Sequence, residues 1–145
     1  MYKTSEEIRT LLNERGVKVT PQRMAVYAAL QTLGHASAEQ ITKAVHDTFP
    51  TVTVGTIYNV LECFSSHGII SRLNTSDNKM YFDINVHDHH HLLCEDTGEI
   101  RDFGDQELSD LVRAYYATHK KPMGENFEVK DIRIQIIGNY TNKIQ

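Results

Sequence analysis

The sequence contains little cysteine, proline and glycine, and it has no tryptophan. Of its 145 residues, two are cysteine, three are proline and eight are glycine. With 40% hydrophobic and 23% charged residues, this composition excludes collagen-like, low-complexity and disordered chains. Cys63 and Cys94 do not form the closely spaced framework of a small secreted protein, so we expect a reducing compartment.

A long apolar run is also missing, since no stretch approaches the roughly 20 residues that a membrane helix needs. Residues 1–16 carry charges where a signal peptide would be apolar. We therefore expect a cytoplasmic protein with no membrane partner. A chain of this length can bury a core as one domain or as two small ones.

Charge is distributed unevenly along the chain, although the net charge of −4 by itself argues against nucleic acid. Residues 1–82 hold eight basic and seven acidic residues, whereas residues 83–145 hold seven basic and twelve acidic ones. Five of the eight histidines lie between positions 87 and 119. This asymmetry predicts two functional halves, with any polyanionic partner facing the first.

The first half shows four helix starts in succession. Each has a capping residue at the expected place: Thr4, Thr20, Ser37 and Thr53. The helices that follow should end before Gly16, at about residue 33, at about residue 48 and before Gly68. The apolar period then changes to two, which predicts strands at 69–73 and 79–83 joined by a polar turn. This order is typical of a winged helix-turn-helix that binds DNA, although a helical module that packs on another protein shows the same pattern.

A histidine cluster occupies the start of the second half. In a strand, His89 and His91 point to the same face, and Asp83 and Asp102 flank them in the sequence. Imidazoles with carboxylates and no thiolate form a site suited to Fe(II), Mn(II) or Zn(II). A solvated loop is the simpler interpretation, but several ligand-type residues at strand spacing favour a metal. Cys94 has the opposite parity to His91, which favours a buried thiol over a ligand.

The remaining elements predict a small α/β layer. Asp105 can cap a helix that carries apolar residues to Tyr115, and a final strand should cover 127–136 with a break between Val129 and Ile132. Two or three strands and one helix cannot cover both of their own faces. A homodimer would bury the uncovered face.

Several motifs together resemble one known family. Residues 19–23 (VTPQR), 53–61 (TVGTIYNVL) and 81–83 (YFD), followed by the histidine cluster, match the ferric uptake regulator family in order and spacing. The resemblance covers almost the whole chain and is greatest to the peroxide-responsive, PerR-type branch. It implies an α+β fold, with a winged-helix DNA-binding domain at 1–82 and a dimerisation and metal-sensing domain at 83–145.

The resemblance also implies a function: a dimeric, metal-dependent repressor that binds an A/T-rich palindromic operator and is not an enzyme. The implied ligands of one Fe(II) or Mn(II) per protomer are His35, Asp83, His89, His91 and Asp102. Peroxide would oxidise His35 and His89 and so release the metal and the DNA. An iron, manganese or zinc sensor without peroxide chemistry is one alternative, and a metallohydrolase is another.

DNA contacts follow from the same resemblance. Tyr58 and Asn59 match base-contacting positions, and Lys18 matches a basic residue that reaches a minor groove. Thr53 and Thr56 are placed to bond phosphates from a helix start. Core packing is the alternative for Tyr58, but its position beside Ile57 places it off the buried stripe.

One departure from the family pattern concerns zinc. Members usually hold a structural zinc through two Cys-x-x-Cys pairs, but here the first pair is reduced to Cys94 and the segment 136–140 contains no cysteine. We therefore expect no structural zinc, with apolar strand and helix contacts in its place. A second metal site from His87, His90 and His119 with Glu107 is a weaker hypothesis.

Overall fold

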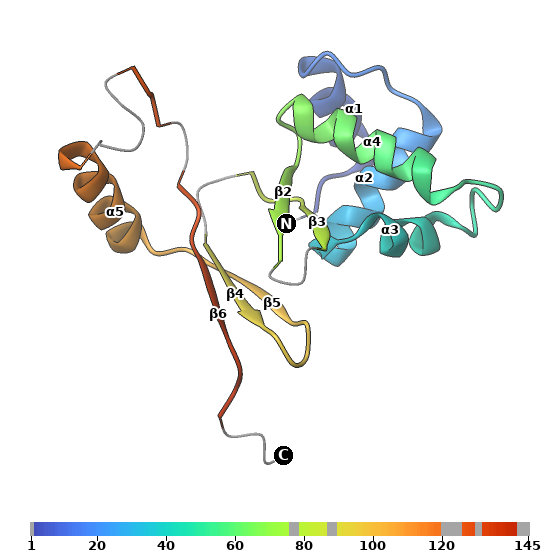
Figure 1. Ribbon diagram of the computed structural model, residues 1–145. Helices are drawn as coiled ribbons and strands as arrows, with labels where there is room; N and C mark the ends of the chain where they lie inside the picture. Colours follow the sequence, from blue (N-terminus) through green and yellow to red (C-terminus); the bar gives the residue numbers. More distant parts are fainter. Residues whose placement is uncertain (1, 76–78, 87–89, 120–125, 130–131, 142–145) are drawn as a thin grey trace. The chain divides into compact units, whose positions relative to one another are not determined.

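The computed structural model describes residues 2–75, 79–86, 90–119, 126–129 and 132–141. By its internal contacts the chain divides into two compact units, Met1–Val86 and His87–Gln145 (Figure 1). The division falls after Val86 rather than after Phe82, because Asp83 still belongs to a strand of the first unit. Within the described residues, no helix is long and apolar enough to cross a membrane.

The first unit contains four helices that begin where the sequence predicts. They are α1 (Ser5–Glu14), α2 (Pro21–Leu33), α3 (Ala38–Val45) and α4 (Val54–Ser66). The side chains of the four predicted capping residues each accept a backbone N–H three residues further on. In α1 and α3 a Glu or Gln side chain completes a capping box. Local sequence therefore determines the helix starts.

A three-stranded antiparallel sheet completes the first unit. It has the order β1 (His35–Ala36), β3 (Met80–Asp83), β2 (Ser71–Asn74). β2 and β3 form the predicted wing, and β1 is a short strand that the sequence analysis missed. In the register of this sheet, His35 lies opposite Asp83. Helices and wing in this order confirm the winged helix-turn-helix.

One hydrophobic core joins the helices of the first unit to its sheet. The side chains that are almost fully buried are Leu12, Val26, Leu30, Ile41, Ile57, Leu61, Phe64 and Phe82. The buried residues of α4 are Ile57, Val60, Leu61 and Phe64, so the opposite face of α4 is left exposed.

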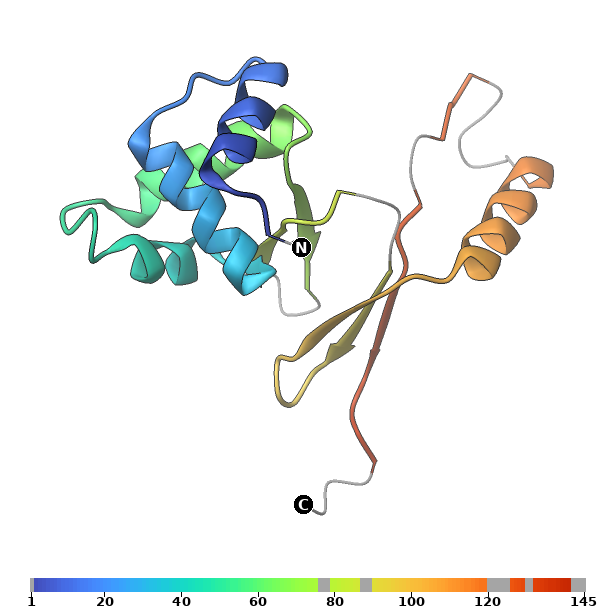
Figure 2. The same ribbon diagram turned by 180° about the vertical axis from the view of Figure 1, so that it is seen from behind.

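The described residues of the second unit form a three-stranded sheet and one helix (Figure 2). The strand order in the sheet is β5 (Ile100–Phe103), β4 (His90–Cys94), β6 (Gln135–Gly138). The helix α5 (Gln106–Thr118) follows β5 in the chain. β5 is antiparallel to β4, and β6 is parallel to it. Asp105 caps α5 as predicted. The α+β class of the chain is confirmed.

Several element boundaries differ from the predictions. β2 covers Ser71–Asn74 rather than 69–73, and β3 begins at Met80 rather than at residue 79. α3 ends at Val45 rather than near residue 48, because the chain turns there through bonds from Thr48 and Phe49 to the Val45 carbonyl. The last strand covers Gln135–Gly138 rather than 127–136, since its pairing with β4 begins only at Gln135. The predicted break falls at residues 130–131, which lie outside the described residues.

Candidate metal centre and nucleic-acid interface

The first unit holds one imidazole–carboxylate pair. Gly34, with a φ of 81°, ends α2 and turns the chain into β1, which places His35 opposite Asp83. The Nε2 atom of His35 lies 3.3 Å from Oδ2 of Asp83, whose side chain is 1% exposed. The other oxygen, Oδ1, accepts the backbone N–H of Asn85 at 2.8 Å. The carboxylate is therefore held in a fixed orientation with one oxygen toward the imidazole.

The second unit holds another such pair. His91 in β4 lies opposite Asp102 in β5, and Nε2 of His91 lies 3.1 Å from Oδ1 of Asp102. The His91 side chain is buried, whereas that of Asp102 is about one-third exposed. The structure thus brings His91 and Asp102 together, as two of the predicted ligands. His89, predicted to share a face with His91, lies outside the described residues.

Both pairs fit a small divalent ion. Two ligands at right angles, each about 2.1 Å from a metal ion, lie about 3.0 Å apart. The two observed separations, 3.3 and 3.1 Å, are close to this value. Nitrogen and oxygen donors without sulfur suit Fe(II), Mn(II) or Zn(II). Neither pair needs a large rearrangement to bind such an ion.

His90, between the two predicted ligands, has a different role. It is fully buried, and its Nδ1 accepts the backbone N–H of Ile134 at 3.1 Å. Because Nδ1 is the acceptor, Nε2 carries the proton and donates to Oγ of Ser109 at 2.8 Å. The ring thus ties β4 to α5 and to the segment before β6. Both of its nitrogens are used within the protein.

His119, another residue of the hypothetical second metal site, also makes contacts within the chain. Nδ1 of His119 lies 2.9 Å from the Tyr115 carbonyl, and the two rings stack with centroids 4.0 Å apart. Glu107 is in the first turn of α5, and His87 lies outside the described residues. The geometry of the described residues does not favour a second site.

The predicted DNA-contacting residues of α4 share its exposed face. Thr53, Thr56, Tyr58 and Asn59 are all exposed. Oγ1 of Thr53 accepts the N–H of Thr56 at 3.3 Å, so this hydroxyl also serves as the helix cap. The Tyr58 ring is 39% exposed and meets the ring of Phe82 edge to face, with centroids 5.9 Å apart. Tyr58 therefore combines partial packing with an exposed edge.

Lys18 is exposed in the link between α1 and α2, and a residue that the sequence analysis missed contacts its backbone. Nη1 of Arg23 donates to the Lys18 carbonyl at 2.8 Å. The VTPQR motif contains this arginine, but a side-chain bond to a backbone carbonyl has no periodic signature in the sequence.

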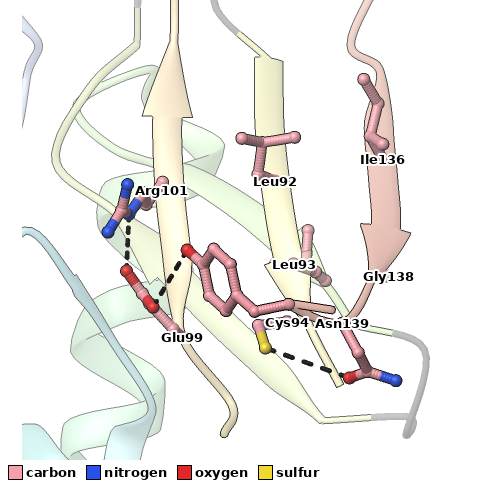
Figure 3. Close-up of a pocket in the computed structure, with 9 residues that line it drawn as sticks. Leu92, Leu93, Cys94, Glu99, Arg101, Ile136, Gly138 and Asn139 are labelled. Atoms are coloured by element: carbon pink, nitrogen blue, oxygen red, sulfur yellow. Dashed lines mark hydrogen bonds and ion pairs between the residues drawn. The ribbon is translucent and has the colours of Figure 1, made fainter. Parts of the chain in front are cut away.

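Polar contacts occupy the end of the second unit where family members usually bind structural zinc. The backbone N–H of Asp96 donates to Oδ1 of Asn139 at 3.0 Å, and the hydroxyl of Tyr140 donates to Oε2 of Glu99 at 3.3 Å. Arg101 pairs with Glu99 at 2.5 Å and lies 5.9 Å from the centre of the Tyr140 ring (Figure 3). We call Asp96, Glu99, Arg101, Asn139 and Tyr140 the polar clasp. It joins the β4–β5 hairpin to the end of β6.

Cys94 lies beside the polar clasp and is buried. Its thiol donates to Oδ1 of Asp96 at 2.9 Å and lies 4.0 Å from Oδ1 of Asn139. A hydrogen bond with the Thr97 side chain lowers the pKa of the Cys94 thiol below its ordinary value. The sequence analysis expected apolar strand and helix contacts here, and the described residues add polar contacts to them. The absence of structural zinc stays a prediction.

A winged helix-turn-helix unit followed by a small α/β unit, with a histidine–aspartate pair in each, defines a class of protein: the metal-responsive regulators of transcription. Comparison with known proteins makes the assignment specific. The chain belongs to the ferric uptake regulator family, whose model matches residues 14–137. It is therefore a regulator and not an enzyme, which sets aside the metallohydrolase alternative.

Individual relatives agree with this assignment. The peroxide-responsive repressor PerR of Staphylococcus aureus is 37% identical over 134 residues, which cover 92% of this chain and 86% of that protein. The ferric uptake regulator of Vibrio cholerae has a TM-score of 0.75 at 27% identity, covering 92% of this chain and 99% of its own. The manganese-bound ferric uptake regulator of Pseudomonas aeruginosa has a TM-score of 0.74 at 26% identity, covering 92% and 98%.

Proposed function

We propose that this protein is a peroxide-responsive repressor that binds an A/T-rich palindromic operator as a dimer when it holds Fe(II) or Mn(II). In this proposal residues 1–82 bind DNA, and residues 83–145 form the dimer and sense the metal. The observation that supports it most is the presence of one preformed histidine–aspartate pair in each unit. The name of the Staphylococcus aureus relative supports the peroxide response.

One ion per protomer would bind His35 and Asp83 from the first unit together with His89, His91 and Asp102 from the second. Three imidazoles and two carboxylates balance the charge of a divalent ion and leave one of six coordination positions for a small ligand. Binding both pairs would fix one arrangement of the two units, because each pair is held rigidly within its own sheet. DNA affinity would then depend on the metal.

Peroxide would act on the ligand imidazoles. When bound, Fe(II) would supply the redox chemistry that activates hydrogen peroxide and would be unchanged overall, whereas Mn(II) would not supply it. Overall, one oxygen atom of the peroxide is added to a ring carbon of His35 or His89 and the other leaves as water, a two-electron oxidation of the ring. His35 is about one-sixth exposed, so a small oxidant can reach its ring. An oxidised ring binds metal poorly, which would release the ion and then the operator.

The second unit provides the surface for a dimer. Its large exposed apolar side chains include Leu92, Leu111, Tyr115, Ile136 and Ile137. In α5, Ser109 is the one described residue that is buried, so this helix packs little apolar surface within its own chain. A second copy would cover these side chains and account for their exposure.

The decisive experiment is a gel-shift titration on a palindromic A/T-rich duplex with Mn(II), Fe(II) or Zn(II), with and without hydrogen peroxide. We expect binding with Mn(II) and with Fe(II), and release by peroxide from the Fe(II) form alone. His35→Asn should abolish the metal dependence. His46→Asn, which changes an exposed histidine outside the two pairs, is the matched control and should behave like the wild type.

Peptide mass spectrometry then separates the two kinds of sensor. The Fe(II) form should gain a single oxygen on His35 or His89 after peroxide treatment, and the Mn(II) form should gain none there. Equal oxidation of both forms, or oxidation confined to methionine and cysteine, would make this protein a plain metal sensor.

A further inference from the structure

The link between α1 and α2 is fixed at both of its ends. At its start, Gly16 has a φ of 74° and donates to the Asn13 carbonyl, while Val17 donates to the Leu12 carbonyl at 2.8 Å. These two bonds form a Schellman motif, in which a glycine ends a helix in the left-handed region. At its end, Thr20 caps α2 by accepting the N–H of Arg23 at 3.1 Å.

Side chains alternate between the core and solvent along this link. Val17 is 3% exposed, Val19 packs partly buried against the core, and Lys18 between them is exposed. The two valines hold the backbone on either side of Lys18. The ammonium group of Lys18 is therefore carried on an anchored backbone and points away from the core.

The side chain of Arg23 also forms a hydrogen bond with the backbone of Lys18. It is in the first turn of α2, and its Nη1 reaches back to donate to the Lys18 carbonyl at 2.8 Å. A guanidinium presents several donors in a rigid plane, so it can fix a carbonyl in one direction better than a flexible amine can. The bond crosses the α2 start and closes the link into a small rigid unit.

We propose that Arg23 is a positioning residue, whose guanidinium holds the backbone of Lys18 so that the Lys18 ammonium is presented to DNA. This inference rests on the proposed DNA contact of Lys18. It differs from the obvious alternative, in which Arg23 itself binds a phosphate. A preordered lysine loses less conformational entropy on binding, which raises the affinity without any new contact.

Salt dependence of DNA binding distinguishes positioning from direct contact. Each phosphate charge that a protein neutralises adds about one unit to the slope of log affinity against log salt. We expect Lys18→Ala to weaken binding about tenfold and to reduce this slope by about one unit. Arg23→Gln should cause a smaller loss of affinity in the wild-type background and no further change in the Lys18→Ala background. A drop in slope of about one unit in both backgrounds would overturn the proposal, because Arg23 would then contact DNA independently.

A second readout does not depend on DNA. In the free protein, the backbone 15N NMR heteronuclear NOE at Lys18 should fall in Arg23→Gln and remain at the wild-type value in Arg9→Gln. Arg9 is exposed on α1, so its substitution removes the same charge elsewhere and serves as the control. Circular dichroism should show the same helix content in all variants. An unchanged NOE at Lys18 in Arg23→Gln would refute the positioning role.

The two readouts also separate this inference from the proposed function. If Lys18→Ala binds DNA as tightly as the wild type, the DNA contact of Lys18 is wrong. The NOE at Lys18 then still decides whether Arg23 orders the link.

Discussion

The polar clasp predicts that the end of β6 remains bound to the β4–β5 hairpin without any metal. Replacing Asn139 and Tyr140 by alanine removes the Asp96–Asn139 hydrogen bond, the Tyr140–Glu99 hydrogen bond and the contact of Arg101 with the Tyr140 ring. The first bond contributes about 1 kcal/mol, and the exposed cation–π contact contributes about 0.5–1 kcal/mol. The long Tyr140–Glu99 bond at an exposed site adds little.

These contributions give a loss of about 2 kcal/mol in the free energy of unfolding for the double variant. For a chain of this size that corresponds to a fall in Tm of roughly 4–8 °C. Differential scanning calorimetry in the presence of a chelator measures this fall directly. Thr141→Ala, which changes an exposed neighbour of Tyr140, is the matched control and should leave Tm unchanged.

The same experiment tests the expected absence of structural zinc. In protein already freed of the proposed regulatory Fe(II) or Mn(II), a chelator should not lower the Tm of the wild type, because the chain has only two cysteines, Cys63 and Cys94. The reasoning is refuted if the double variant melts like the wild type while the chelator lowers Tm. That result would show that a tightly held metal, and not the polar clasp, fastens β6.

Three further predictions follow from individual residues. Asn59→Ala should weaken specific operator binding by about 1–3 kcal/mol and relax base preference at one position, since Asn59 is exposed on α4; a gel-shift series with single-base operator variants measures both effects. Gly55→Ala should raise the free energy of unfolding by about 0.5–1 kcal/mol, as measured by a urea titration, because an added Cβ meets only Oγ1 of Thr53, at 3.9 Å. A lower stability would show that the first turn of α4 cannot accept a side chain. The lowered pKa of the Cys94 thiol predicts the pH dependence of its alkylation by iodoacetamide: the rate should reach half its maximum at a pH below the ordinary pKa of a thiol. Thr97→Ala should move this midpoint to higher pH. An unchanged midpoint in Thr97→Ala would contradict the cause given for the shift.

Elements with local signals could be predicted from the sequence. Thr20 followed by Pro21 indicates a helix start from adjacent residues alone, and α2 begins there. β1 has no such signal, because two residues contain no period and are extended only through pairing with β3. The position of β6 depends on its parallel pairing with β4, which lies about forty residues earlier in the chain. Long-range pairing of this kind cannot be inferred from local periodicity.

The candidate site shows the same division. The family resemblance identified His35, Asp83, His91 and Asp102, which the structure joins as two pairs. That His89 shares a face with His91, and that these residues bind a metal, stay predictions. The sequence does not reveal what His90 does, because its partners Ser109 and Ile134 come from distant segments. The role of Arg23 was equally hidden, since any arginine in the first turn of a helix has the same local pattern.

The turn between β4 and β5 has a consequence for the accuracy of strand alignment. A run of three histidines at 89–91 invites an error, since sliding β4 by one residue along β5 would set His90 opposite Asp102 in place of His91. The bonds that His90 makes to Ser109 and Ile134 do not oppose such a slip, because it would bring another histidine to the position of His90. The turn does oppose it: Gly98, with a φ of 74°, donates to the Cys94 carbonyl at 2.8 Å, and Cys94 donates to the Glu99 carbonyl at 2.9 Å. Because turn geometry fixes the register of a hairpin, this turn keeps a chemically repetitive strand in a single alignment.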